Sequence, residues 1–178
     1  MPLRAPSRRA VQLGALLLCC IARAAGAQDV PGRWELTDYD PTHQTGKSQI
    51  ALWLQADQRI LNPHPVDPHN VRALPLLSIQ CQGGQSEFFI NLNFEADRGP
   101  VDVSYSLDGG PAMDATWQVR DSGVSVAPED RVDFVRSLLG RRRLDLTLTF
   151  AGAEPTSTGF DIAGIEAALE KLRPSCPW

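Results

Sequence analysis

Apolar and polar residues alternate with a period of two along most of the chain, which is the pattern of strands that bury one face. In the segment SEFFINLNFE, Phe88, Ile90, Leu92 and Phe94 fall on one face, and mostly polar residues fall on the other. The same alternation recurs in VDVSYSLD and RRLDLTLTF, and around residues 34–39, 50–54, 77–81 and 113–119. The pattern therefore predicts roughly eight short antiparallel strands.

Short strands separated by turns, without a dominant long helix, predict a mainly β fold, an antiparallel β-sandwich. The turn Asp108-Gly109-Gly110 is expected to join two strands as a hairpin. PEDRVDFVRSLLG predicts a short helix that ends at Gly140, and AGIEAALEKLR predicts a short C-terminal helix that ends before Pro174.

The first 27 residues are predicted to be a secretory signal peptide that is cleaved after Ala27. Arginines precede an apolar stretch over residues 11–22, and small residues occupy the cleavage position. The apolar stretch is too short for a good membrane span, and a cut after Ala24 is an alternative. We therefore expect residues 28–178 to form a single β-sandwich domain in the periplasm, without stable membrane insertion.

Four cysteines occur, and Cys19 and Cys20 lie within the predicted signal peptide. The remaining pair, Cys81 and Cys176, would meet an oxidising compartment after export, so a disulfide between them is expected. A zinc site usually needs four ligands, which makes a metal role for two isolated cysteines the poorer interpretation. The disulfide would hold the C-terminal tail, which would otherwise fray.

The charge balance becomes more acidic once residues 1–27 are removed. The remaining 13 basic and 21 acidic residues give a net charge of −8. Such a surface repels polyanions, which argues against nucleic acid or an anionic membrane surface as a partner.

The candidate metal ligands are His64, Asp67 and His69 in the segment HPVDPH. Two imidazoles and a carboxylate can bind zinc with one position open. They lie in a proline-rich stretch with no helix to fix their spacing, so an exposed loop is the preferred interpretation. No pattern in the sequence points to a catalytic residue or to a cofactor.

Two aromatic residues interrupt the polar faces of their strands. Phe89 lies on the face opposite Phe88 and Ile90, and Trp53 lies opposite its apolar neighbours. If they look outward, the pair could form a binding patch. Packing beneath the C-terminal helix is the preferred alternative.

Three segments in a fixed order carry a resemblance to a known family. PLLSIQCQGGQSEFFINLNF is a strand–Cys–strand segment, and VDVSYSLDGGPAMDATWQV is an Asp-Gly-Gly hairpin followed by a tryptophan. LDLTLTFAGAEPTSTGFDIAGIEAALEKLRPSCPW contains a strand, a Pro-Thr turn, a Phe-Asp-x-x-Gly helix start and a Cys-x-Trp tail. Together, over about residues 34–178, they resemble the type VI secretion-associated TagO/VasI family.

The resemblance implies an exported accessory protein of a bacterial contractile secretion apparatus, with no known catalytic residues and no cofactor. We therefore expect a periplasmic, non-enzymatic protein that contacts an envelope component of that apparatus. Trp53, Phe89 and the Asp108-Gly109-Gly110 turn are the candidate contact residues.

Two other functions stay open. One is a small exported metal-dependent hydrolase, supported only by His64, Asp67 and His69. The other is an inhibitor or immunity-type binding protein, whose acidic surface would suit a basic target enzyme.

Overall fold

The computed structural model describes residues 32–39, 49–63, 71–120, 122–176 and 178. The described chain is mainly β, with two short helices, as the alternation predicts. In chain order the elements are β1 (Glu35–Tyr39), β2 (Gln49–Gln55), β3 (Ile60–Leu61), β4 (Arg72–Ala73), β5 (Leu76–Gln82), β6 (Gln85–Asn91), β7 (Pro100–Leu107), β8 (Met113–Val119), β9 (Ser125–Ala127), α1 (Arg131–Ser137), β10 (Arg143–Thr149), β11 (Thr156–Asp161) and α2 (Ile165–Leu169).

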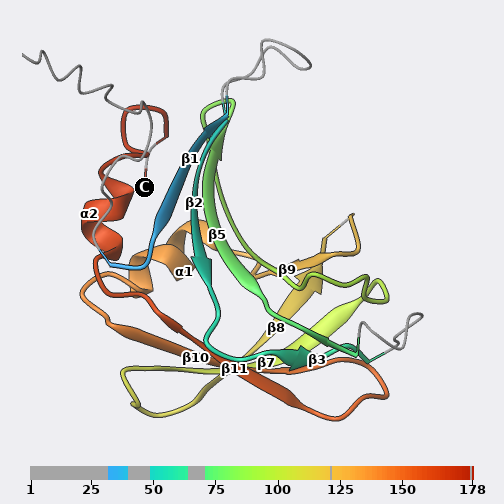
Figure 1. Ribbon diagram of the computed structural model, residues 1–178. Coiled ribbons are helices and arrows are strands. Elements are labelled where there is room, and N and C mark those ends of the chain that lie inside the picture. Colours follow the sequence, from blue (N-terminus) through green and yellow to red (C-terminus); the bar gives the residue numbers. More distant parts are fainter. Residues whose placement is uncertain (1–31, 40–48, 64–70, 121, 177) are drawn as a thin grey trace, which may run out of the picture.

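Nine of these strands form one hydrogen-bonded sheet in the order β1-β2-β5-β6-β9-β8-β7-β10-β11. Every neighbouring pair in this sheet is antiparallel. We call β1, β2, β5 and β6 the first half, and β7, β8, β10 and β11 the second half. Figure 1 shows the strands of the first half standing steeply across those of the second half. The two layers of the expected sandwich are thus halves of a single sheet.

The short strand β9 is the joint at which the sheet changes direction. It pairs with β6 only through Ile90↔Val126 and Asn91↔Ser125. It pairs with β8 only through Gln118↔Ala127 and Val119↔Val126. Two register pairs constrain the neighbouring strands much less than the seven between β5 and β6, so the halves can turn toward one another.

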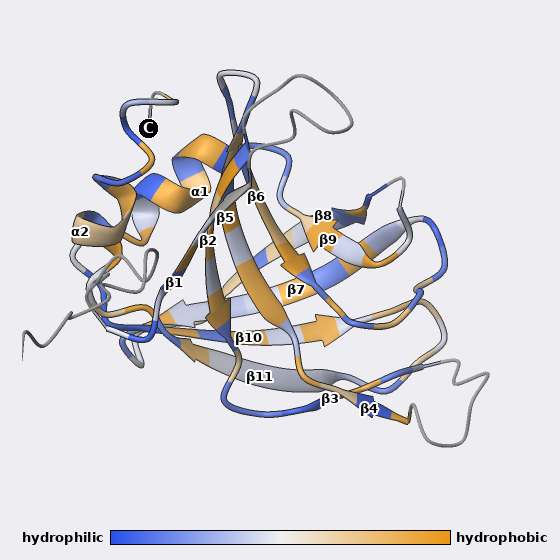
Figure 2. Cartoon of the chain, turned by 45° about the horizontal axis from the view of Figure 1, so that its top comes forward, coloured by the Kyte–Doolittle hydropathy of each residue, from blue (hydrophilic) through white to orange (hydrophobic). Residues whose placement is uncertain are grey.

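One hydrophobic core lies between the two halves. The inward-facing residues of both halves belong to the same buried cluster, and apolar positions recur along the strands of each half in Figure 2. From the first half the cluster includes Leu52, Ile79, Phe88 and Ile90, and from the second Val103, Trp117, Leu146, Leu148 and Phe160. Burying apolar area stabilises the fold by about 25 cal/mol per Å², so this shared core is the main reason for the bend.

The helix α1 fills the core at the joint, because its aromatic residue reaches both halves. The ring of Phe134 lies 4.8 Å from that of Phe88 in the first half. It lies 5.1 Å from the ring of Trp117 and 5.3 Å from that of Tyr105 in the second half. The predicted helix is confirmed, but it ends at Ser137, three residues before Gly140, which adopts a positive φ of 73° in the turn that follows.

The side of the molecule away from β9 is closed by the connection that follows β2. The N–H of Asp57 donates to the carbonyl oxygen of Gly159 in β11 at 2.9 Å. The hydroxyl of Thr158 donates to the carbonyl oxygen of Gln58 at 2.8 Å. We call this contact between β11 and residues 57–58 the seam, and it brings the second half back against the first.

The C-terminal tail is held by the disulfide that the cysteine count predicts. Cys81 in β5 is bonded to Cys176, with 5.6 Å between their Cα atoms. Both cysteines are buried. The buried residues of α2 belong to the core cluster, and Trp178 packs against that cluster. The aromatic terminus therefore covers the core beside a covalent anchor.

Two strands, β9 at the joint and β11 in the second half, do not show the alternation pattern. β9 has only three residues, too few to show a period. The sequence pattern predicts no strand over Thr156–Asp161, where the structure forms β11. Thr156, Thr158 and Phe160 face inward there, so two of the three inward positions are threonines. A polar inward face hides a strand from a search for hydrophobic periodicity.

No helix within the described ranges has both the length and the apolar character needed to cross a membrane.

The disulfide is expected to contribute substantially to stability, because it closes a loop between residues 95 positions apart. The loop-entropy relation gives roughly 4–5 kcal/mol, and native bridges usually contribute about 2–5 kcal/mol. We expect the double variant Cys81→Ala/Cys176→Ala to unfold at lower temperature and lower urea concentration than the wild type. A reductant should weaken the wild type and leave the double variant unchanged. Equal stability of the two proteins would contradict this role.

Candidate functional site

The most distinctive surface lies on the outer face of the first half, where aromatic side chains break a polar pattern. Register pairs align Glu35, Trp53, Ser78 and Phe89 in one row across β1, β2, β5 and β6. The rings of Trp53 and Phe89 meet edge to face, with centroids 6.3 Å apart and planes at 79°. The structure thus brings together two candidate residues that are 36 positions apart in the printed sequence.

An arginine from the other side of the joint covers Phe89. The guanidinium carbon of Arg120, which follows β8, lies 4.7 Å from the centroid of the Phe89 ring. Its Nη1 lies 3.2 Å from Oε2 of Glu87, and Nε of Arg131 lies 3.6 Å from the same oxygen. One carboxylate in β6 therefore holds two arginines beside the aromatic pair. We call Trp53, Phe89, Arg120, Glu87 and Arg131 the aromatic–arginine patch.

Beneath the patch, the outer face of the sheet is well shielded from solvent. Ser78 lies between the two rings with a relative exposure of 0 %. Leu76, one outward position further along β5, is half-buried and adds an apolar side chain to the same face. Phe89 itself is 9 % exposed, whereas Trp53 is half-buried, so Trp53 presents the larger accessible aromatic surface.

A depression of about 550 Å³ adjoins the patch where β9 ends. Its lining comprises Thr116, Gln118, Val119, Arg120, Ala127, Pro128, Glu129 and Arg131. Arg120 and Arg131 belong to both the patch and the depression, so the two form one continuous surface. Its arginines are balanced by Glu87 and Glu129, which leaves the surface without a net charge.

Packing beneath the C-terminal helix, the preferred sequence interpretation of the aromatic pair, is wrong. The buried residues of α2 are Ile165, Ala168 and Leu169, and all three belong to the core cluster. Trp53 and Phe89 lie on the opposite face of the sheet and do not belong to that cluster.

The candidate hairpin turn Asp108-Gly109-Gly110 joins β7 and β8, and its aspartate makes hydrogen bonds within the fold. Asp108 and Gly109 have positive φ values of 53° and 69°. The N–H of Gly110 donates to the carbonyl oxygen of Leu107 at 2.9 Å, so the turn is of type I′. A carboxylate oxygen of Asp108 accepts from the backbone N–H groups of Arg142 and Arg143 at 2.8 and 2.9 Å. These hydrogen bonds hold the pKa of Asp108 below its ordinary value. The carboxylate therefore anchors the start of β10.

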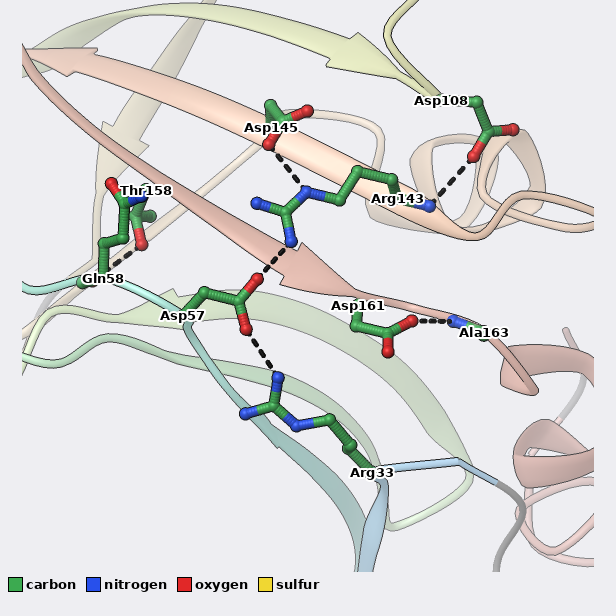
Figure 3. A network of polar contacts seen from close by, with 9 residues as sticks. All are labelled: Arg33, Asp57, Gln58, Asp108, Arg143, Asp145, Thr158, Asp161 and Ala163. Carbon is green, nitrogen blue, oxygen red and sulfur yellow. Dashed lines mark hydrogen bonds and ion pairs between the residues drawn. The ribbon is translucent and has the colours of Figure 1, made fainter.

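A network of ion pairs crosses the seam (Figure 3). Arg143 in β10 donates from Nη1 to Asp57 and from Nε to Asp145, the latter at 2.8 Å. Asp57 also accepts from Nη1 of Arg33 at 2.5 Å. Burial alone would raise the pKa of Asp57, but hydrogen bonds from Arg143 and Arg33 outweigh that effect and lower it. For Arg143, burial opposes the charged form, and the bonds to Asp57 and Asp145 raise its pKa.

The guanidinium of Arg143 lies directly against the backbone of Gly159 in β11. A Cβ atom at Gly159 would overlap with the guanidinium and would lie 2.6 Å from Oδ1 of Asp145. The absence of a side chain at residue 159 is therefore what allows Arg143 to reach Asp57 across the seam.

The comparison with protein families identifies the chain. The family model described as "Type VI secretion system VasI, EvfG, VC_A0118" matches residues 37–178. This chain belongs to the VasI family. The resemblance inferred from the ordered segments is confirmed, and the protein is a type VI secretion system-associated protein. Searches of the curated proteins and of the solved structures find no match.

The match places this VasI-family protein among secretion-system components and includes the aromatic–arginine patch and both cysteines of the disulfide. The candidate metal ligands His64, Asp67 and His69 lie outside the described residues. Within the described ranges, no group of three or more His, Cys, Asp or Glu side chains could hold a metal ion.

Sequence reasoning found Trp53 and Phe89 but missed their polar partners. Arg120 and Arg131 are distant in sequence from Glu87 and carry no motif. Glu87 lies on the polar face of its strand, yet its side chain is only 18 % exposed. The available signal was Glu87, two positions before the outward-facing Phe89. Its arginine partners can be identified only in the folded structure, where the bend brings the end of β8 and the start of α1 beside β6.

We expect the stability of the VasI-family protein to depend on pH through Asp57. A carboxyl whose pKa is lowered by folding stabilises the fold above its unfolded pKa, near 3.8, and loses this contribution as the pH falls through its folded pKa. Asp57→Asn should lower the free energy of unfolding at neutral pH by about 1–2 kcal/mol, because Arg143 and Arg33 lose a charged acceptor. The deficit relative to wild type should shrink in acid below pH 3.8.

Urea unfolding of both proteins at neutral and acidic pH measures this dependence. Asp114→Asn, in the exposed part of β8, is the matched control and should behave as wild type. A deficit that stays constant across the pH range would show that Asp57 acts through packing rather than charge.

Proposed function

We propose that this VasI-family protein is a non-enzymatic accessory protein of the type VI secretion system that acts in the periplasm through protein–protein contact. The family match is the observation that carries the proposal. The partner we propose is an envelope component of the apparatus.

The periplasmic location is supported by two independent features. The first 27 residues have the charge, apolar stretch and small-residue cleavage pattern of a signal peptide. The bond between Cys81 and Cys176 is of the kind that persists in oxidising compartments and is rare in the cytosol.

The aromatic–arginine patch is the surface that we assign to the partner. Interface centres are enriched in tryptophan, phenylalanine and arginine, and the largest single contributions to binding come mainly from tryptophan, tyrosine and arginine. Here Trp53 and Arg120 are partly exposed, ordered by Phe89 and Glu87, and continuous with a depression of about 550 Å³. The side chain of Asp108, by contrast, is already engaged within the fold, so the hairpin is the weaker candidate.

Release of the secreted tube protein by a clean deletion strain tests the accessory role. We expect release to fall strongly on deletion and to return when the wild-type gene is supplied. Trp53→Ala should restore release poorly, because it removes the accessible aromatic surface of the patch. Gln82→Ala, at an exposed position beside the β5–β6 turn and outside the patch, is the control and should restore it fully.

Periplasmic extracts should contain equal amounts of the wild type and both variants, so that a loss of release reports contact rather than folding. Normal release by the deletion strain would contradict the accessory role. Full restoration by Trp53→Ala would instead remove the patch from the proposal.

A further inference from the structure

A second surface, on the outer face of the second half, has a different chemical character from the aromatic–arginine patch. A depression of about 220 Å³ lies over β7, β10 and β11. Its polar lining includes Ser104, Ser106, Thr147, Ser157, Arg143 and Asp145. The hydroxyl oxygens of Thr147 and Ser157 are 2.8 Å apart, so neighbouring strands already link their hydroxyls across this face.

At the end of this depression, the Arg143 guanidinium has one nitrogen that is left for a ligand. Its Nε and Nη1 are bound by Asp145 and Asp57, whereas Nη2 has no hydrogen-bond partner among the described residues. Figure 3 shows this third nitrogen pointing toward the side where Gln58 and Thr158 lie, and both residues line the depression. Because two carboxylates fix the guanidinium, its free donors are held in position before any ligand arrives.

The charges around the depression favour a neutral ligand. Arg143 and Arg33 are balanced by Asp57 and Asp145, so the cluster offers an anion no net attraction. Hydroxyls both donate and accept, the free guanidinium nitrogen donates, and carboxylate oxygens accept. This set of groups matches a ligand that is itself rich in hydroxyl groups.

The depression continues across the sheet, which sets the shape of the ligand. A second depression of about 460 Å³ shares Ser104 with the first and is also lined by Asp102, Asp114 and Thr116. Strands lie about 4.8 Å apart, so the combined surface from β8 to β11 spans about 15 Å across three spacings. The ligand that fits is therefore a chain lying across the strands rather than a single small ring.

We propose that the outer face of β8, β7, β10 and β11 binds a neutral oligosaccharide, with Arg143 and Asp145 hydrogen-bonding one end of the chain. This proposal is independent of the secretion role. A polyhydroxylated chain could come from the cell-wall glycan or from a glucose polymer, and both offer the same hydroxyl chemistry. Chitotetraose, a chain of N-acetylglucosamine, and maltotetraose, a chain of glucose, represent the two sources.

Amide chemical shifts of the isotopically labelled protein, titrated with each tetrasaccharide, test the proposal. We expect saturable shifts at Ser104, Thr147 and Ser157 with one of the two probes, with a Kd on the order of 1 mM. The probe that binds identifies the source. Ser157→Ala, which removes one hydroxyl, should weaken binding roughly threefold to tenfold.

A blocking variant and its matched control separate this face from the rest of the protein. Ser104→Ile places a side chain between the two depressions and should abolish the shifts, since isoleucine is well tolerated in strands. Thr37→Ile, at an exposed position on β1 in the first half, should leave binding unchanged. Absence of saturable shifts with both probes, or shifts that persist unchanged in Ser104→Ile, would overturn the proposal.

Discussion

A nine-stranded sheet with one apolar face must bury that face, and the rest of this structure depends on how it does so. Two short helices are too small to cover such a sheet, so the sheet covers itself. β9 is the point that allows this, because its ladders are only two pairs long. The single core, the seam between Asp57 and Gly159, and the anchored C-terminal tail all follow from that bend.

The bend also creates the two surfaces to which we assign binding. It brings Arg120 and Arg131 to Glu87 and so completes the aromatic–arginine patch. On the other side it brings Asp57 to Arg143, which positions the guanidinium at the end of the hydroxyl-lined depression. One face is aromatic and suited to a protein, and the other is polar and suited to hydroxyl-rich ligands.

Local patterns predict what is local in this molecule. Alternation identifies β6 and β7, the two cysteines that follow the predicted signal peptide identify the disulfide, and the Asp-Gly pair identifies the β7–β8 turn. The continuity of the sheet through β9 cannot be predicted from the sequence, because a three-residue strand is too short to show an alternation pattern. β11 is missed for a different reason. Thr156 and Thr158 occupy inward positions that an alternation search expects to be apolar, and residue 159 is a glycine because the Arg143 guanidinium lies against its backbone. The partners of Phe89 depend on contacts between distant segments, which no local pattern encodes.

Backbone nuclear Overhauser effects measured on the labelled protein test the central claim, that one sheet folds over one core, most directly. We expect cross-peaks at the joint, between Ile90 and Val126, and at the seam, between Asp57 and Gly159. Both should appear together with those of the ordinary ladders, such as β5–β6. Cross-peaks within each half, without any at the joint or at the seam, would show two separate sheets and would contradict a single folded sheet.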